Sequence, residues 1–206
     1  MKNFNEKETA VVKYIIRSFL DLIEGSVEMF KGNREKIGIM LSLICIDVIS
    51  KWSEIYELEE NKANKKRFYK WVDDFIYTHE NPIYSENEKE FKSTITKEVV
   101  WKLRNSLVHF YGLPVKINNR RLGIFNKKFE NSDPLLKILK ENHVNILNFT
   151  IFFNAIKEGI KLFGEKIAKN SLNKSPKHIK GILKMYEIYQ DEGGEILKEK
   201  THKQQK

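Results

Sequence analysis

The strongest constraint on the fold is an apolar seam between residues 146 and 167. Its members recur at steps of three and four residues, and they are Ile146, Phe149, Phe153, Ile156, Ile160, Phe163 and Ile167. This spacing follows the turn of an α-helix, so all these side chains fall along one face. Such a face is stable only when another helix or a second subunit covers it. The seam therefore predicts a long helix packed in a bundle or at an interface.

The same helical period recurs along most of the chain. Further apolar stripes predict helices over residues 5–30, 37–52, 62–77 and 85–110, and a last helix that begins at Ser175-Pro176. Asp133-Pro134 is a good helix start ahead of the seam. The stretch 37–52 is apolar on nearly every side, so we expect that helix to be buried among the others. Only 10 Gly and 4 Pro in 206 residues leave few breaks between helices. The sequence therefore predicts an all-α, multi-helix bundle.

Residues 113–132 interrupt this pattern. Two short apolar runs, 115–117 and 122–125, flank a polar Asn118-Asn119 centre, and we expect a small hairpin or an ordered loop there. The length of the chain fits one domain, which we place at residues 1–192. We expect the basic tail over residues 193–206 to be disordered.

Two capping signals predict helix boundaries in the middle of the chain. Asn81-Pro82 should end the helix before it, because proline removes a backbone donor and clashes with the preceding turn. Ser85 to Glu88 has the spacing of a capping box, in which the serine and glutamate side chains each satisfy a backbone amide. We therefore predict one helix from Ser85 to about Phe110, with a kink near Thr94.

Composition limits the partners and the compartment. The formal charge of +9, of which residues 197–206 supply +3, favours a polyanion, because bound lysine and arginine release counterions from phosphates. The single cysteine, Cys45, lies in the most apolar stretch, so we expect a small buried hydrophobe rather than a nucleophile. Neither a secretion signal nor a membrane-spanning run is evident, and we expect a cytoplasmic protein with no membrane partner. The histidines have no metal-ligand spacing, so no metal or cofactor is predicted.

One segment, Arg104 to Tyr111, contains side chains that could carry out catalysis. Its histidine, His109, can exchange a proton near neutral pH, and Arg104 can hold phosphate oxygens with paired donors. Together they can cleave a phosphodiester without a metal ion. Asn105 and His109 share one helix face, whereas Arg104 and His109 lie about 140° apart around the axis. Two copies of the helix across a two-fold axis would bring both groups to one groove, which favours a homodimer.

This segment resembles the signature of HEPN domains, in which arginine is followed by four to six residues and then histidine, preferably with asparagine directly after the arginine. Here Arg104 and His109 are separated by Asn105, Ser106, Leu107 and Val108. The longer form of the signature has a tyrosine two residues past the histidine, and Tyr111 matches it.

The resemblance implies a helical, metal-independent endoribonuclease, often a toxin or an antiviral defence effector, with its cleft at a homodimer interface. His109 would activate the ribose 2′-hydroxyl or protonate the leaving oxygen. Arg104 would stabilise the phosphate, and Asn105 would orient one of the two. In toxin members with the longer signature, a nucleotidyltransferase antitoxin attaches AMP to the tyrosine, which Tyr111 matches.

Structural interpretations of the same residues remain open. Arg104 and His109 can be a helix-end ion pair and a histidine favoured by the helix dipole, and Tyr111 can be a buried ring. Asp47 interrupts the apolar helix 37–52, where it can pair with Arg104 or His109, or lie on a narrow wet edge with Ser42 and Ser50. The alternative function is a catalytically idle, HEPN-like helical module that binds a protein or nucleotide partner.

A basic cluster follows the motif along the chain. Phenylalanines 125 and 129 are interleaved with four cations, which are Arg120, Arg121, Lys127 and Lys128. These side chains can form a lip that follows RNA phosphates while the rings stack on bases. They can equally form a solvated loop anchored by the two rings.

Overall fold

The computed structural model of the chain describes residues 6–32, 34–59, 62–110, 116–117, 120–125, 133–172 and 176–193. Within these ranges, the side chains of residues 6–9, 107–110, 116–117, 120–122, 145, 172 and 190–193 lie outside the description. The predicted tail also lies outside it, except for Gly193, where the last helix ends as expected.

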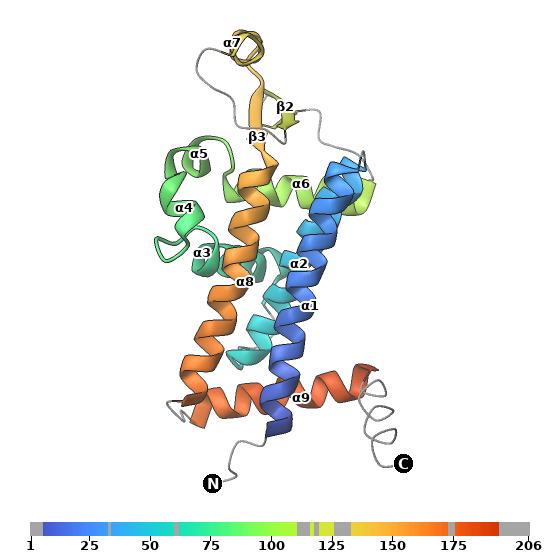
Figure 1. Cartoon of the computed structure of the whole chain (residues 1–206), viewed down its shortest axis with the longest axis vertical. Helices are drawn as coiled ribbons and strands as arrows, with labels where there is room; N and C mark the ends of the chain where they lie inside the picture. Colours follow the sequence, from blue (N-terminus) through green and yellow to red (C-terminus); the bar gives the residue numbers. More distant parts are fainter. Residues whose placement is uncertain are drawn as a thin grey trace.

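The helical bundle is formed by α1 (Glu6–Lys31), α2 (Glu35–Tyr56), α3 (Asn64–Phe75), α6 (Lys97–Phe110), α8 (Phe149–Leu172) and α9 (Pro176–Gly193). The long helices α1 and α8 run side by side, α6 crosses near one end of the bundle, and α9 crosses near the other (Figure 1). The all-α prediction is confirmed. Within the described ranges, no helix combines the length and the apolarity that a bilayer crossing needs.

The predicted seam lies on α8 over most of its length. Its residues from Phe149 to Ile167 are all buried in the core of the same chain. The ring centroid of Phe163 lies 5.3 Å from that of Phe75 in α3 and 6.0 Å from that of Tyr56 in α2. Phe149 stacks on Phe30 of α1 at 5.5 Å. Neighbouring helices of the same chain therefore cover the seam.

The seam predicted a helix from Ile146 onward, but the first residues of this stretch belong to a small β-sheet. Strands β1 (Lys116–Ile117) and β2 (Arg120–Phe125) pair antiparallel, which confirms the predicted hairpin. Strand β3 (Asn145–Asn148) pairs parallel with β2, so Ile146 lies in a strand and the helical interpretation of that residue was wrong. Its hydrogen-bond partners are more than 20 residues away along the chain, and local periodicity does not report them.

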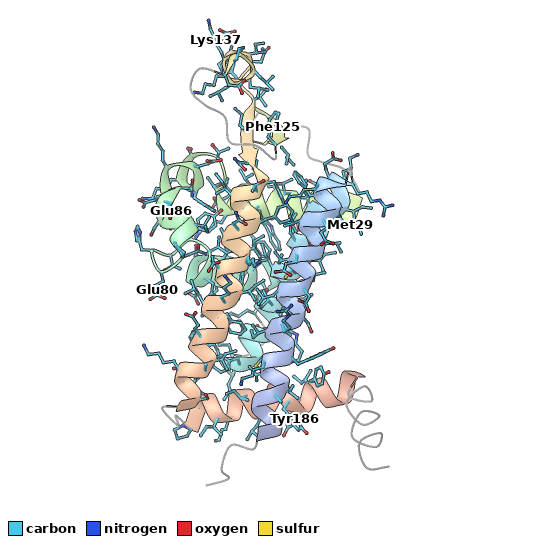
Figure 2. The ribbon with its side chains drawn as sticks, viewed as in Figure 1. Met29, Glu80, Glu86, Phe125, Lys137 and Tyr186 are labelled. Carbon is cyan, nitrogen blue, oxygen red and sulfur yellow. The ribbon has the colours of Figure 1, made fainter. Side chains whose placement is uncertain are left out.

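Helix α7 (Pro134–Glu141) connects the hairpin to β3 and begins at the predicted Asp133-Pro134 cap, where the Asp133 carboxylate accepts from the Leu135 amide at 2.9 Å. The sheet and α7 project beyond the end of the bundle where α6 crosses (Figure 1). Figure 2 shows Lys137 on α7 and Phe125 on β2 in this projection.

The single helix predicted over residues 85–110 is wrong, because three helices occupy this stretch: α4 (Pro82–Glu86), α5 (Glu88–Ser93) and α6. Asn81 caps α4, and Pro82 begins it at a position where the missing amide costs nothing. The Asn81 side chain also donates to the carbonyls of Phe75 and Ala155, both at 2.9 Å. These tertiary bonds favour a helix start before the expected capping box, and the Ser85 hydroxyl donates to a preceding carbonyl instead.

Helix α9 crosses the end of α2 at very short range. A Cβ atom added at Gly181 of α9 would lie 2.0 Å from the carbonyl oxygen of Tyr56. Only a residue without a side chain can occupy this crossing, so Gly181 sets the distance between the two helices.

Candidate functional site

Arg104 lies at the junction of α2 and α6 and is only 8% exposed. Its Nη2 atom is 2.5 Å from Oδ2 of Asp47 on α2, and its Nη1 atom donates to Oδ1 of Asn105 at 3.1 Å. The guanidinium carbon lies 5.2 Å from the centroid of the Trp101 ring. A carboxylate, an amide and an aromatic face therefore hold this cation in one orientation.

A second arginine, Arg67 of α3, approaches the same carboxylate. Its Nη2 atom is 4.0 Å from Oδ1 of Asp47, its Nη1 atom is 3.7 Å from Oε2 of Glu54, and its Nε donates to the Ser50 hydroxyl at 3.4 Å. Asp47 thus lies between the guanidinium groups of Arg67 and Arg104. We call the set of Asp47, Glu54, Arg67 and Arg104 the ion network.

Glu54 anchors the network at the end of α2, where it is 3% exposed. Burial opposes its ionisation, but hydrogen bonds from Lys51 and from the Lys62 amide, with the charges of Lys51 and Arg67, hold the pKa of the Glu54 carboxyl below its ordinary value. The two hydrogen bonds measure 2.7 Å and 2.6 Å. Glu54 is therefore ionised at neutral pH and ties α2 to the start of the next segment.

The structure decides between the two interpretations of Asp47. Its pairing with Arg104 is present. A wet edge is not, because Ser42 and Ser50 are buried and each hydroxyl donates at 2.7 Å to a carbonyl of its own helix. Pairing of Asp47 with the imidazole of His109 lies outside the described residues.

The structure brings Arg104, Asn105 and Asp47 together and leaves the other predicted site residues unplaced. The backbone of His109 lies in the last turn of α6, but its side chain is outside the description. Arg120 and Arg121 belong to β2, and their side chains are outside it too. Tyr111, Lys127 and Lys128 are wholly outside the described ranges.

Sequence reasoning missed Arg67 and Glu54. Glu54 follows Asp47 by seven residues, which places both carboxylates on one side of α2, and this spacing within an apolar helix was a usable signal. Arg67 had no such signal, because its partners lie on another helix and only the packing of α3 against α2 brings them within reach.

One face of α2 is left partly exposed by the described residues, whereas the sequence predicted a helix buried among the others. Ile37 and Val48 are 43% and 42% exposed. Three more apolar residues at helical spacing on the same face are partly buried, which defines the α2 stripe as Ile37, Leu41, Ile44, Val48 and Ile55. Asp47 lies about 100° around the axis from Val48, so the stripe runs beside the ion network.

Cys45 faces the core, where burial raises the pKa of its thiol to about 12. The thiolate, which is the reactive form, is therefore negligible at neutral pH, as expected for a buried hydrophobe. Among the side chains that the structure describes, no group of three or more His, Cys, Asp or Glu residues is arranged to hold a metal ion.

The network and the stripe together present a fixed cation beside an apolar surface. Such a cation can bind a phosphate oxygen and stabilise negative charge that develops on it. No family model, curated protein or solved structure matches this chain.

Proposed function

We propose that this protein is a metal-independent endoribonuclease of HEPN type that acts as a homodimer. The observation that supports it most is the placement of Arg104, whose guanidinium is held in one orientation beside the apolar α2 stripe. His109 follows five residues later on the same helix. An RNA substrate also agrees with the formal charge of +9, and the proposed location is the cytoplasm.

The proposed reaction uses the 2′-hydroxyl of RNA as the nucleophile. The imidazole of His109 accepts the 2′-hydroxyl proton, O2′ bonds to phosphorus, and the bond from phosphorus to O5′ breaks. The leaving O5′ receives a proton from an imidazolium, which leaves a 2′,3′-cyclic phosphate and a 5′-hydroxyl. In a dimer, the two copies of His109 can divide the roles of base and acid. Arg104 stabilises the charge on the phosphate oxygens.

Asp47 and Asn105 act on Arg104 as positioning residues in this proposal. Asn105 holds one arm of the guanidinium and Asp47 the other. A guanidinium has five N–H donors, so a phosphate can share the cation with Asp47. The fixed orientation lowers the cost of aligning the cation in the transition state.

The α2 stripe is the surface that we propose for the dimer interface. Ile37 and Val48 are exposed apolar side chains on an otherwise well-packed helix, and burying them against a second copy removes apolar area from water. A two-fold axis on this stripe would place the two Arg104 side chains on either side of it, in one composite groove. Arg120, Arg121, Lys127 and Lys128 would extend the groove for RNA.

A toxin role would give Tyr111 a purpose as the acceptor of AMP from a nucleotidyltransferase antitoxin. An adjacent nucleotidyltransferase gene, with AMP transfer to the wild type and none to Tyr111→Phe, would support this part of the proposal.

The direct test is cleavage of labelled RNA in the presence of EDTA. We expect His109→Ala and Arg104→Ala each to slow cleavage by about 10²-fold or more, the usual contribution of acid–base and charge-stabilising groups. His79→Ala and Lys92→Ala are controls, because the two side chains are 75% and 66% exposed and lie outside the network. Products that end in a 2′,3′-cyclic phosphate would support attack by the 2′-hydroxyl.

One observation favours the second candidate, a catalytically idle module that binds a protein or nucleotide partner. Arg104 is mostly buried and already paired with Asp47, which is how a purely structural arginine is placed. Equal RNA cleavage, or equal absence of it, in the wild type and His109→Ala would select this second function.

A further inference from the structure

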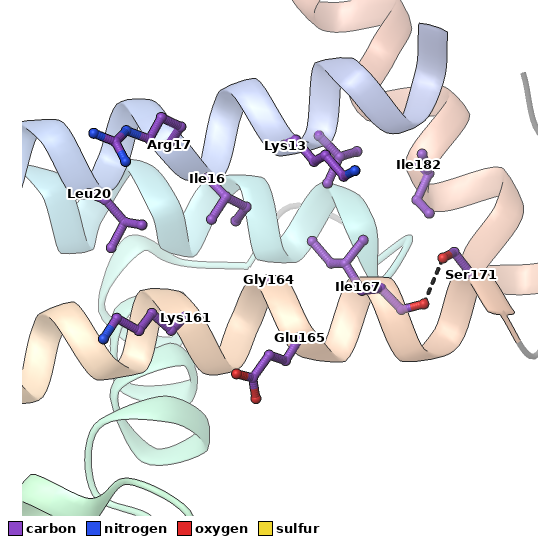
Figure 3. A pocket seen from close by; sticks show the side chains of 12 residues that line it. Lys13, Ile16, Arg17, Leu20, Lys161, Gly164, Glu165, Ile167, Ser171 and Ile182 are labelled. Carbon is purple, nitrogen blue, oxygen red and sulfur yellow. Dashed lines mark hydrogen bonds between the residues drawn. The ribbon is translucent and has the colours of Figure 1, made fainter. Parts of the chain in front are cut away.

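A groove lies between α1, α8 and α9, near the end of the bundle that is opposite to α6 (Figure 1). Its volume is about 490 Å³, which is within the range of small-molecule sites. The inner wall is apolar and is formed mainly by Val12, Ile16, Leu20, Ile167 and Ile182 (Figure 3). The groove shares no residue with the ion network or the α2 stripe.

Small residues on α8 leave this space open. Gly164 faces Ile16, and an added Cβ atom would lie 3.3 Å from its Cγ2. Ala168 and Ser171 continue the same side of the helix. The Ser171 hydroxyl donates to the Ala168 carbonyl at 2.6 Å, so its polar group is used within α8 and the groove wall stays apolar (Figure 3).

Four charged side chains belong to the lining. Lys13 and Arg17 come from α1, and Lys161 and Glu165 come from α8, which gives three cations and one acid. Figure 3 shows Arg17 and Lys161 at the same end of the groove, on facing helices, while Ile167 and Ile182 lie toward the other end. Lys13 lies nearer to Ile167 and Ile182 in the same view. The groove therefore has two cations together at one end, and an apolar wall that extends away from them.

The ion pairs that Arg17 and Lys161 already form leave both cations able to bind an anionic ligand. Arg17 pairs with Asp21 at 2.8 Å, and these side chains are 70% and 55% exposed. Lys161 pairs with Glu158 at 2.6 Å, and these side chains are 44% and 28% exposed. Exposed pairs of this kind are weak, so an anion can share the two cations. Among the described residues, no carboxylate forms an ion pair with Lys13.

We propose that this groove binds a single-chain amphipathic anion, of the chemical class of a fatty carboxylate. The hydrocarbon chain lies along Ile16 toward Ile167 and Ile182, where it removes apolar wall from water. The carboxylate lies between Arg17 and Lys161. Apolar walls alone would accept any alkyl chain, so the two cations make the site selective for a negative head group.

Matched probes test this selectivity. The full-length protein is titrated with decanoate, decan-1-ol and decyltrimethylammonium below micelle formation, and binding is followed by amide NMR shifts. We expect decanoate to bind at least about fivefold more tightly than the cationic probe and to shift amides around Ile16 and Ile167. The double variant Arg17→Gln/Lys161→Gln should weaken decanoate by about tenfold and leave decanol unchanged. Lys137→Gln on the exposed face of α7 is the control.

A second variant tests the position of the site. Gly164→Leu should fill the groove and abolish binding of all three probes, while the double charge variant still tests the proposal if Gly164→Leu does not fold. Equal affinity for decanoate and decyltrimethylammonium would overturn the proposal. So would unchanged decanoate binding in either folded variant, or binding only to vesicles of anionic lipid with none to free decanoate.

Discussion

Asp47 and Arg104 are separated by 57 residues in the sequence and by 2.5 Å in space, where the carboxylate of α2 meets the guanidinium of α6. Asp47 is 21% exposed in its side chain and Arg104 10%. Their attraction therefore acts mostly away from water, and removing one charge leaves the other poorly solvated. The pair joins α2, which carries the α2 stripe, to α6, which carries the backbone of His109.

The first prediction concerns this pair. Asp47→Asn should lower the free energy of unfolding by about 2 kcal/mol, below the usual cost of breaking a fully buried pair because Asp47 is partly hydrated. Urea unfolding of the wild type and the variant measures this difference in the free energy of unfolding. The control is Asp73→Asn, whose exposed bridge to Lys97 should contribute less than about 1 kcal/mol. Equal losses in the two variants would show that the Asp47–Arg104 pair contributes no more than a surface bridge.

The second prediction follows from the lowered pKa of Glu54. A carboxyl whose folded pKa is below its unfolded value stabilises the protein above the unfolded pKa, and this contribution is lost as pH falls through the folded pKa. The wild type should therefore exceed Glu54→Gln in unfolding free energy at neutral pH. The difference should shrink as pH falls below the ordinary value of 4.5. Unfolding curves across this range test it, and a difference independent of pH would rule out the ionised carboxylate as its source.

The third prediction compares two glycines within helices. Gly181→Ala should destabilise the protein by about 2 kcal/mol, because its new methyl group meets the Tyr56 carbonyl and α9 must shift. Gly25→Ala, with nothing within 4 Å of its added Cβ, should stabilise α1 by up to about 1 kcal/mol. Thermal unfolding followed by circular dichroism measures both. A neutral Gly181→Ala would mean that the α2–α9 crossing is looser than described.

The fourth prediction concerns the proposed dimer. Val48→Glu should convert a dimer to a folded monomer and reduce RNA cleavage with it, because a charge at the centre of the α2 stripe cannot be buried alone. Leu135→Glu on α7 is the matched control, since Leu135 is 41% exposed and Val48 42%. Sedimentation at several concentrations measures the mass. A monomeric wild type, or a dimer that survives Val48→Glu, would remove the α2 stripe as the interface.

The local spacing of apolar residues was sufficient to predict the long helices and the face that each of them buries. The stripe of α1 and the seam of α8 were predictable because each side chain's face depends on its position in a regular helix. The same reasoning located the Asp133-Pro134 start of α7 and the Pro176 start of α9. It also selected Arg104, Asn105 and Asp47, and it offered pairing of Asp47 with Arg104 as one of two alternatives.

The errors occurred where a distant residue competed with a local signal. The capping box at Ser85 was weaker than Asn81, whose side chain bonds to two carbonyls, one of them 74 residues away. Ile146 continued the helical period of α8 but lies in β3, because β2 offers it backbone partners. The apolar composition of α2 suggested a helix buried among the others, yet Ile37 and Val48 are exposed on one of its faces.

The amino-acid sequence by itself determined the helical class, the faces of the long helices and the residue types available for chemistry, because these depend on spacing within a few turns. Tertiary structure decided which charges meet. Asp47, Glu54, Arg67 and Arg104 come from three helices, and their distances depend on how α2, α3 and α6 pack. Electrostatic energy depends on distance and burial, and neither quantity exists before the helices have packed.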